Sequence, residues 1–140
     1  LEQCVEITKR RLANFAFYAK ELASLVSRSC FRIPTVSKDT TNNAHIFFLI
    51  LPSEEKRKLF QSKLKEHGIA SISHYVPLHS APAGMKFGRV GTGSESMSVT
   101  FEVFRGLTRL PLWVGLEEKD LQKVVTSIQQ GCDDIFPNAD

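Results

Sequence analysis

The chain has 140 residues, of which 42% are hydrophobic and 24% are charged, and it carries a net charge of +3 at pH 7. These values are ordinary for a chain that forms one globular domain. Lysine and arginine are spread along the sequence rather than concentrated, which argues against a nucleic-acid-binding function.

The cysteines and the N-terminal composition indicate a reducing compartment. Three cysteines lie far apart, at Cys4, Cys30 and Cys132, and no CxxC pair occurs. This odd, scattered set predicts reduced thiols rather than a disulfide framework or a cysteine zinc site. The N-terminus has no apolar signal-peptide core, and the longest apolar run, residues 44–51, is far too short to span a membrane. We therefore expect a cytoplasmic protein that does not act at a membrane.

Residues 1–28 are predicted to form one long helix. Apolar residues recur at spacings of three, four and seven, which predicts one buried stripe made of Val5, Leu12, Phe15, Ala19, Leu22 and Val26. The pattern starts without an N-cap residue, from which we expect further sequence upstream.

Residues 29–131 are predicted to form a sheet-and-helix core. Residues 45–51 are almost continuously apolar, as in a buried strand. Ser53 as N-cap and Gly68 as the residue after the C-cap predict a helix between them, and its buried face is expected to contain Leu59, Phe60 and Leu64. Residues 69–73 predict a second strand, which completes a strand–helix–strand unit.

The C-terminal half begins with residues 74–96, where Pro77, Pro82 and four glycines predict mostly irregular structure. Residues 99–105 are compatible with a strand or a helix, and residues 107–113 predict a short strand that Pro111 ends. A closing amphipathic helix is predicted over 117–130, stopped by Gly131, with an inward face of Leu121, Val124, Val125 and Ile128. Residues 132–140 are expected to be a frayed tail. The whole predicts a single α+β domain with a small antiparallel or mixed sheet flanked by helices.

Residues 74–79, HYVPLH, form the candidate binding segment. Pro77 bends the chain, so we expect His74 and His79 to lie near each other, with Tyr75 between them in sequence. No third ligand adjoins them, and we predict no metal site. Two interpretations remain: a surface loop whose histidines make hydrogen bonds, or a rigid loop that presents two imidazoles and a phenol to a ligand.

The other candidate sites are weaker. The glycines at 84, 88, 91 and 93 do not have the spacing of a nucleotide-binding loop. Cys30 is expected in the core, and His45 is expected to be structural. No catalytic triad, acid pair or nucleophile elbow is present, so the residues by themselves predict no catalytic side chain.

Four segments together resemble the C-terminal part of the DegT/DnrJ/EryC1 family of sugar aminotransferases, and most of all the dTDP-4-amino-4,6-dideoxygalactose transaminases. They are residues 10–23, 43–51, 64–88 and 107–113, the last followed by the final helix. The most specific part is HYVPLHSAPAG at 74–84, followed by RLPL at 109–112.

The resemblance implies a fold-type I enzyme that uses pyridoxal phosphate to move an amino group, usually from glutamate, to the keto carbon of a nucleotide-linked sugar. In such homodimeric enzymes a large N-terminal domain carries the Schiff-base lysine. This chain would be the small C-terminal domain alone, without the large domain, and is expected to be inactive by itself. His74, Tyr75 and His79 would hold sugar or diphosphate oxygens, because the chemistry belongs to the cofactor.

One departure and two alternatives accompany the resemblance. Residues 97–106 are more apolar than the polar helix that usually precedes RLPL in this family, and this difference affects the expected substrate contact surface. The first alternative is a non-catalytic module derived from the small domain, which binds a sugar nucleotide or a protein. The second is an unrelated ferredoxin-like binding domain, which the strand–helix–strand pattern alone would allow.

Overall fold

A small antiparallel sheet lies at the centre of the molecule. The computed structural model describes residues 2–90 and 97–137. In it β1 (Phe47–Ile50) and β2 (Ile72–Ser73) both pair with β3 (Leu107–Leu110), which gives the order β1-β3-β2. The register places Phe47 opposite Leu110 and Ile72 opposite Arg109. The strand that comes last in the sequence is therefore the central one, and the predicted α+β class is confirmed.

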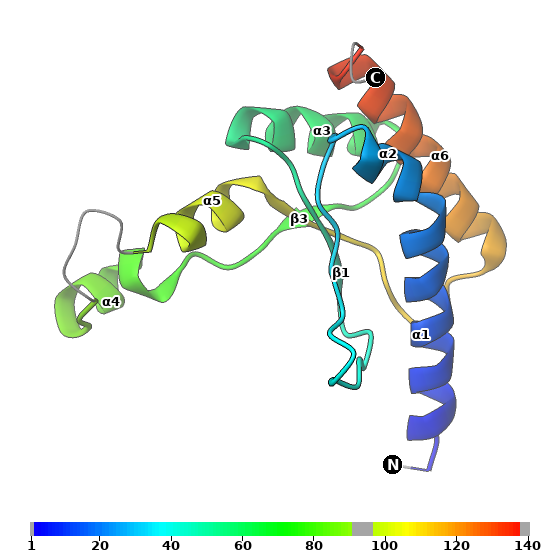
Figure 1. The fold of residues 1–140 in the computed structure, drawn as a ribbon, viewed down its shortest axis with the longest axis horizontal. Helices are drawn as coiled ribbons and strands as arrows, with labels where there is room; N and C mark the ends of the chain where they lie inside the picture. Colours follow the sequence, from blue (N-terminus) through cyan, green and yellow to red (C-terminus); the bar gives the residue numbers. More distant parts are fainter. Residues whose placement is uncertain (1, 91–96, 138–140) are drawn as a thin grey trace.

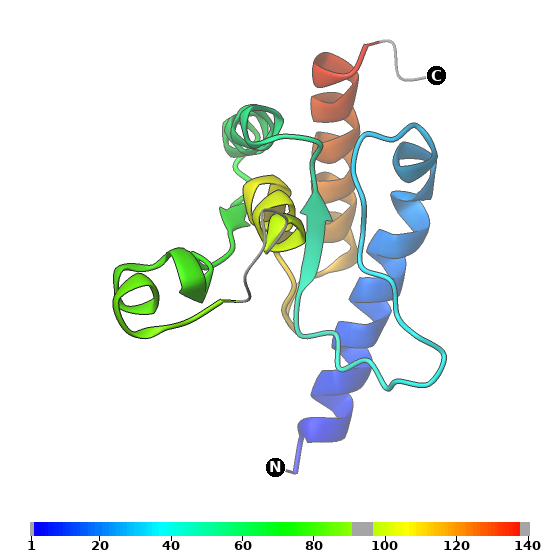
Figure 2. The ribbon, with the colours of Figure 1, turned by 60° about the vertical axis from the view of Figure 1, so that its left-hand side comes forward.

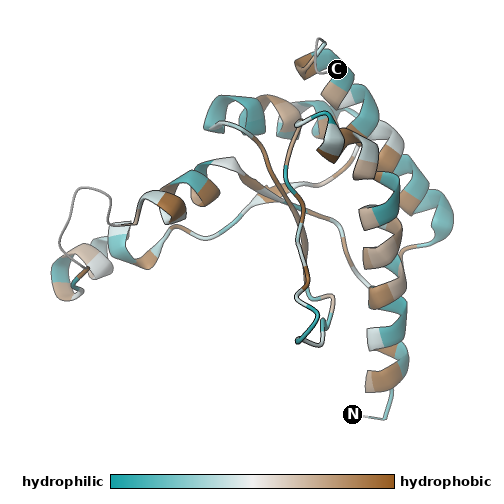
Figure 3. Cartoon of the chain, in the orientation of Figure 1, coloured by the Kyte–Doolittle hydropathy of each residue, from teal (hydrophilic) through white to brown (hydrophobic). Residues whose placement is uncertain are grey.

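Helices pack around this sheet. Figure 1 shows α1 (Cys4–Glu21) beside α6 (Glu118–Ile135), and the turned view of Figure 2 shows the same pair together. The helix α3 (Glu54–Glu66) packs against α6. Hydrophobic colour follows the central strands in Figure 3, whereas α3 and α6 carry much hydrophilic colour. The largest fully buried side chains are Tyr18, Phe47, Phe60, Leu22 and Leu49.

The N-terminal helix differs from the prediction. It is interrupted at Leu22, after which α2 (Ala23–Ser27) follows. Burial is confirmed at Phe15 and Leu22, but Val5 is 81% exposed and Leu12 is 37% exposed. The predicted stripe is wrong at these two positions because the N-terminal part of α1 extends past the sheet, as Figure 1 shows.

The helix α3 has both of its predicted ends. The Ser53 hydroxyl accepts a hydrogen bond of 3.2 Å from the backbone N–H of Lys56, and Gly68 has a φ of 73°. Its buried face is shifted by part of a turn, since Leu59 is 47% exposed whereas Arg57 is buried beside the apolar core. An arginine can occupy such a position only when its donors are satisfied.

Residues 74–90 and 97–106 form an arm that projects from the sheet (Figure 1). It contains a short 3₁₀ turn (Leu78–Ser80), then α4 (Pro82–Phe87) and α5 (Ser98–Gly106). The prediction of irregular structure is wrong for α4, because Pro82 is at the first helical turn, where a missing N–H costs nothing. Residues 99–105, whose sequence is compatible with a strand or a helix, are helical. Gly91 and Gly93 lie outside the described residues.

The closing helix is longer than predicted. Leu121, Val124, Val125 and Ile128 are buried as expected, but α6 continues through Gly131 to Ile135. The prediction of a helix stop and a frayed tail is therefore wrong for residues 131–135. Gly131 lies inside the helix against Phe60, and Ile135 is buried. No helix among residues 2–90 and 97–137 is long and apolar enough to cross a membrane.

Candidate functional site

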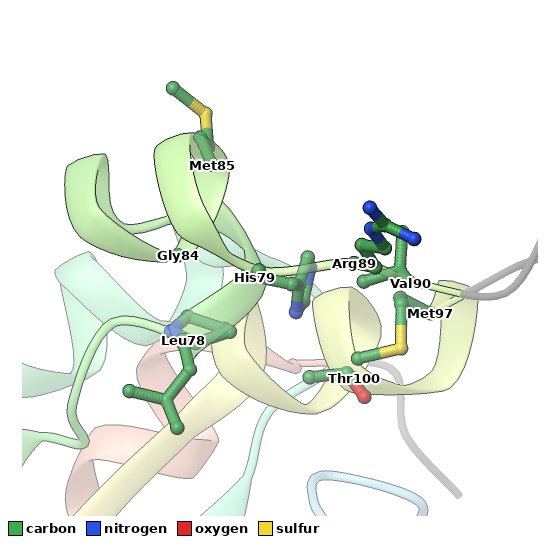
Figure 4. Close-up of a pocket in the computed structure, with 10 residues that line it drawn as sticks. Leu78, His79, Gly84, Met85, Arg89, Val90, Met97 and Thr100 are labelled. Atoms are coloured by element: carbon green, nitrogen blue, oxygen red, sulfur yellow. The ribbon is translucent and has the colours of Figure 1, made fainter.

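Two cavities on the arm contain the three predicted site residues. His74 and Tyr75 directly follow β2, and they line a cavity of about 340 Å³ whose other wall is α5. We call this the His74–Tyr75 cavity. It is lined by His74, Tyr75, Pro77, Val99, Thr100, Val103, Phe104 and Leu107. His79 lines a second space of about 770 Å³, the His79 cavity, which Figure 4 shows in close-up.

The His74–Tyr75 cavity combines an apolar wall with a polar, aromatic rim. The rings of His74 and Tyr75 are tilted against each other, with centroids 5.2 Å apart. The guanidinium carbon of Arg109 lies 5.8 Å from the centroid of the Tyr75 ring. Tyr75 is 78% exposed, so a ligand in solution can reach its ring face and its hydroxyl. Aromatic rings with a polar end are typical of ligand contacts.

His79 is in a different environment. Its ring lies edge-on to Phe101, with centroids 4.8 Å apart, and Figure 4 shows it between α4 and α5. Its Nε2 atom is buried and has no hydrogen-bond partner among the described residues. The guanidinium group of Arg89 points away from it in Figure 4. The 3₁₀ turn after Pro77 thus assigns His79 to another cavity than His74, and Pro77 and Thr100 line both.

No metal centre is formed by the part of the chain that the structure describes. It contains no group of three His, Cys, Asp or Glu side chains that could hold an ion. Cys30 is fully buried, as expected of a core residue. His45 is exposed, and its Nδ1 lies 3.4 Å from a guanidinium nitrogen of Arg11.

Neither arm cavity has an amine to which pyridoxal phosphate could attach. A Schiff base requires a lysine amine inside the cofactor cavity. The residues that line the His74–Tyr75 cavity and the His79 cavity include no lysine. Lys86 is on the same arm, but its ammonium lies 5.0 Å from the centroid of the Phe87 ring. These two cavities therefore offer contacts to a ligand but no covalent attachment for the cofactor.

Sequence reasoning missed the α5 wall of the His74–Tyr75 cavity. Val99 and Val103 are four residues apart, and this spacing places them on one face of a helix. The sequence contains this spacing, but residues 99–105 are also rich in β-branched residues and phenylalanine, which suit a strand equally well. Arg57, which donates hydrogen bonds to Arg105 on α5 and to Ser73 on β2, had no distinctive signal.

Comparison with known proteins identifies the family. Residues 1–129 match the DegT/DnrJ/EryC1/StrS aminotransferase family. The structure of DesV from S. venezuelae in complex with a ketimine intermediate is similar with a TM-score of 0.83 and 25% identity, over 95% of this chain and 34% of that chain. The PMP form of the putative sugar aminotransferase Spr1654 from Streptococcus pneumoniae has a TM-score of 0.80 and 20% identity, over 97% and 33%.

A third similar structure, the aminotransferase TlmJ from Streptoalloteichus hindustanus, has a TM-score of 0.80 and 18% identity, over 96% of this chain and 34% of that chain. This chain thus spans about a third of the length of these solved proteins. The predicted fold, a small sheet flanked by helices as in the C-terminal domain of such enzymes, agrees with these likenesses. Because the family match covers residues 1–129, the chain belongs to the DegT/DnrJ/EryC1/StrS aminotransferase family.

Proposed function

We propose that this chain is the small domain of a pyridoxal-phosphate-dependent aminotransferase, which transfers an amino group from glutamate to a keto-sugar linked to a nucleotide. The observation that carries the proposal is the placement of His74 and Tyr75. They emerge from a strand of the central sheet and line an accessible cavity, in a chain of this family. The ketimine complex of DesV and the PMP form of Spr1654 support the choice of cofactor.

In the proposed enzyme this chain binds and orients the sugar nucleotide. The cofactor, when bound, supplies the carrier of the amino group. The imidazoles of His74 and His79 and the hydroxyl of Tyr75 donate or accept hydrogen bonds with sugar or diphosphate oxygens. His79 lines the His79 cavity and its Nε2 has no hydrogen-bond partner among the described residues, which supports such a contact. None of the three is assigned a proton-transfer step.

The large domain of the same enzyme, or a second subunit of its homodimer, is the proposed protein partner. Large apolar side chains are exposed on the arm and on the first turns of α1, and they include Val5, Leu78, Met85 and Phe87. Exposed apolar side chains in such number are typical of a contact surface. Since no lysine lines either arm cavity, the chain by itself is proposed not to transaminate.

The alternative is a non-catalytic module that keeps the sugar-nucleotide site or binds a protein. The same two cavities favour it, because they provide ligand contacts without an amine for the cofactor. The two proposals differ in what the His74–Tyr75 cavity serves, since only the first requires a pyridoxal phosphate enzyme around it.

The test is calorimetric titration of the purified chain with dTDP-glucose, with pyridoxal phosphate followed in parallel by its absorbance. We expect saturable sugar-nucleotide binding and no aldimine band. His74→Ala and His79→Ala should each weaken binding by about tenfold, as expected for the loss of one hydrogen bond. His67→Ala, an exposed histidine at the end of α3, is the matched control and should bind normally.

Each result has a defined meaning. A stable aldimine at a lysine of this chain would contradict the view that the cofactor attachment lies elsewhere. Equal binding by wild type, His74→Ala and His79→Ala would refute the assignment of these histidines. Binding that is about tenfold weaker in both variants, with no aldimine, is the result that the proposed small domain and the binding module both require. Restored transamination on addition of a large domain would then select the enzyme.

A further inference from the structure

Arg57 is a buried arginine whose donors reach three separate parts of the chain. Only 8% of its surface is exposed. Its Nε donates a 2.7 Å hydrogen bond to the carbonyl oxygen of Arg105, and its Nη1 donates to the hydroxyl of Ser73 and, at 3.0 Å, to Oε1 of Gln61. Its Nη2 lies 3.7 Å from the carboxylate of Glu54, which supplies a counter-charge. The guanidinium is thus held on several sides.

Two of these partners lie on the elements that lead into opposite walls of the His74–Tyr75 cavity. Arg105 is in the last turn of α5, the helix that contributes Val99 and Val103 to one wall. Ser73 is the last residue of β2 and directly precedes His74, which begins the other wall. One planar guanidinium therefore connects α5 and β2, which lead into the two walls, to the same point of α3.

A second contact reinforces the β2 side. Gln61, one turn after Arg57 on α3, donates a 2.9 Å hydrogen bond to the hydroxyl of Thr108 on β3, and its Nε2 is 3.4 Å from the hydroxyl of Ser73. Thr108 is fully buried. Because β2 has only two residues paired with β3, few ladder hydrogen bonds hold it. Side-chain bonds from α3 therefore supply much of the restraint on the strand that carries His74.

We propose that Arg57 is a positioning residue, which sets the separation of α5 from the His74–Tyr75 segment and so presents these two side chains to the ligand. The identity of that ligand, a sugar nucleotide, rests on the proposed function, whereas the positioning role does not. Arginine is required because its rigid fork has several donors that point in different directions. A lysine would keep the charge but has a single nitrogen, which cannot bond to both walls in the same way.

The competing explanation is that Arg57 only fills the space between α3 and the sheet. In that case, replacing it would lower stability without a specific change in the cavity. The two explanations predict different effects on the environment of His74 and Tyr75. This environment is therefore compared between variants that lose a contact of Arg57 and variants that lose other contacts of α3.

The experiment uses Arg57→Lys and the milder Ser73→Ala, which removes the hydroxyl that Arg57 and Gln61 contact on β2. Two controls lie on the same helix: Leu64→Ala, which removes a fully buried core side chain, and Lys63→Gln, which removes an ion pair of 2.9 Å to Asp134 on α6. The readout is the NMR signal of the imidazole of His74 and of the ring of Tyr75, assigned by comparison with His74→Ala and Tyr75→Phe. Urea denaturation of each variant gives its stability, and titration with dTDP-glucose gives its affinity.

We expect Arg57→Lys and Ser73→Ala to shift or broaden the His74 and Tyr75 signals, and Arg57→Lys to weaken dTDP-glucose binding by about tenfold. Leu64→Ala should lose stability while these signals stay in place. Unchanged signals in Ser73→Ala and in a folded Arg57→Lys would overturn the proposal, as would equal shifts in Leu64→Ala. If Arg57→Lys does not fold, Ser73→Ala decides. Signal shifts in a protein whose wild type binds no dTDP-glucose would refute the proposed ligand and leave the positioning role intact.

Discussion

Replacing Gly106 with alanine should destabilise the protein, although alanine is the better helix former. Gly106 is the last residue of α5, where this helix passes over the end of β1. A Cβ at this position would lie 2.3 Å from the carbonyl oxygen of Leu51 and 3.1 Å from Cγ2 of Ile50. The carbonyl of Gly106 also accepts a 2.9 Å hydrogen bond from the N–H of Leu51. An added methyl group must therefore push α5 away from β1.

The size of the effect follows from three contributions. Overpacking of this kind costs about 1–3 kcal/mol. Weakening the hydrogen bond between Leu51 and Gly106 adds about 1 kcal/mol. The better helix propensity of alanine returns at most about 1 kcal/mol. We expect Gly106→Ala to lower the free energy of unfolding by about 1–3 kcal/mol.

Gly131→Ala is the matched control, because Gly131 is also a buried helical glycine. A Cβ there would have its nearest neighbours at 3.7 Å, an ordinary van der Waals distance. This substitution should raise the free energy of unfolding by about 0.5–1 kcal/mol. Urea denaturation followed by circular dichroism measures both variants. A Gly106→Ala variant as stable as wild type, or an equal loss of unfolding free energy in both variants, would show that close approach at Gly106 does not limit the residue there.

Three further predictions concern single side chains. Ser53→Ala should lower the free energy of unfolding by about 1 kcal/mol in urea, because α3 loses its N-cap; no change would contradict the cap. Tyr18→Phe should lose about 1–2 kcal/mol at pH 8, since a buried carbonyl loses its donor. Burial raises the pKa of Tyr18. The free energy of unfolding of the wild type should therefore fall above pH about 10, where the phenol ionises only in the unfolded chain, and its difference from that of Tyr18→Phe should become smaller. A difference that does not change with pH would refute this. A thiol reagent should label only Cys4 in the native chain and all cysteines in urea, because Cys30 and Cys132 are buried and burial raises the pKa of Cys132; native labelling of more than one thiol would contradict the packing.

Features that depend on neighbouring residues were predictable from the sequence. The start of α3 at Ser53 and its end before Gly68 follow from capping, which acts within one helical turn. The end of β3 at Leu110 follows from Pro111, which has no N–H for the ladder. Such signals need no knowledge of the rest of the fold.

The effects of glycine and proline on the ends of helices were not predictable in the same way. Gly131 was expected to stop α6, but the helix continues because Phe60 packs against it. Gly106 ends α5 where the close approach of Leu51 excludes larger residues. Pro82 was expected to prevent regular structure, and instead it begins α4. In each case the outcome is decided by a contact or a helix position that the local sequence does not reveal.

The candidate site was predictable as a segment but not as an arrangement. The sequence indicates an accessible loop at 74–79, and His74 and Tyr75 are indeed exposed. Their role in binding stays a prediction. Arg57 could not be found, because a charged residue on a helix is expected at the surface. Its burial depends on Ser73 and Arg105, which are 16 and 48 residues away in sequence.

Polar side chains from two helices hold residues 105–113, which contain β3. Asn14 on α1 donates a 3.2 Å hydrogen bond to the carbonyl of Trp113, and Tyr18 donates one of 2.9 Å to the carbonyl of Pro111. On α3, Arg57 donates to the carbonyl of Arg105 and Gln61 donates to the hydroxyl of Thr108. Because a buried polar group is costly unless it is bonded, these bonds define one position for β3 and its flanks. The walls of the His74–Tyr75 cavity join residues 105–113 because α5 leads into β3 and β2 pairs with β3. The geometry of the cavity therefore depends on the core.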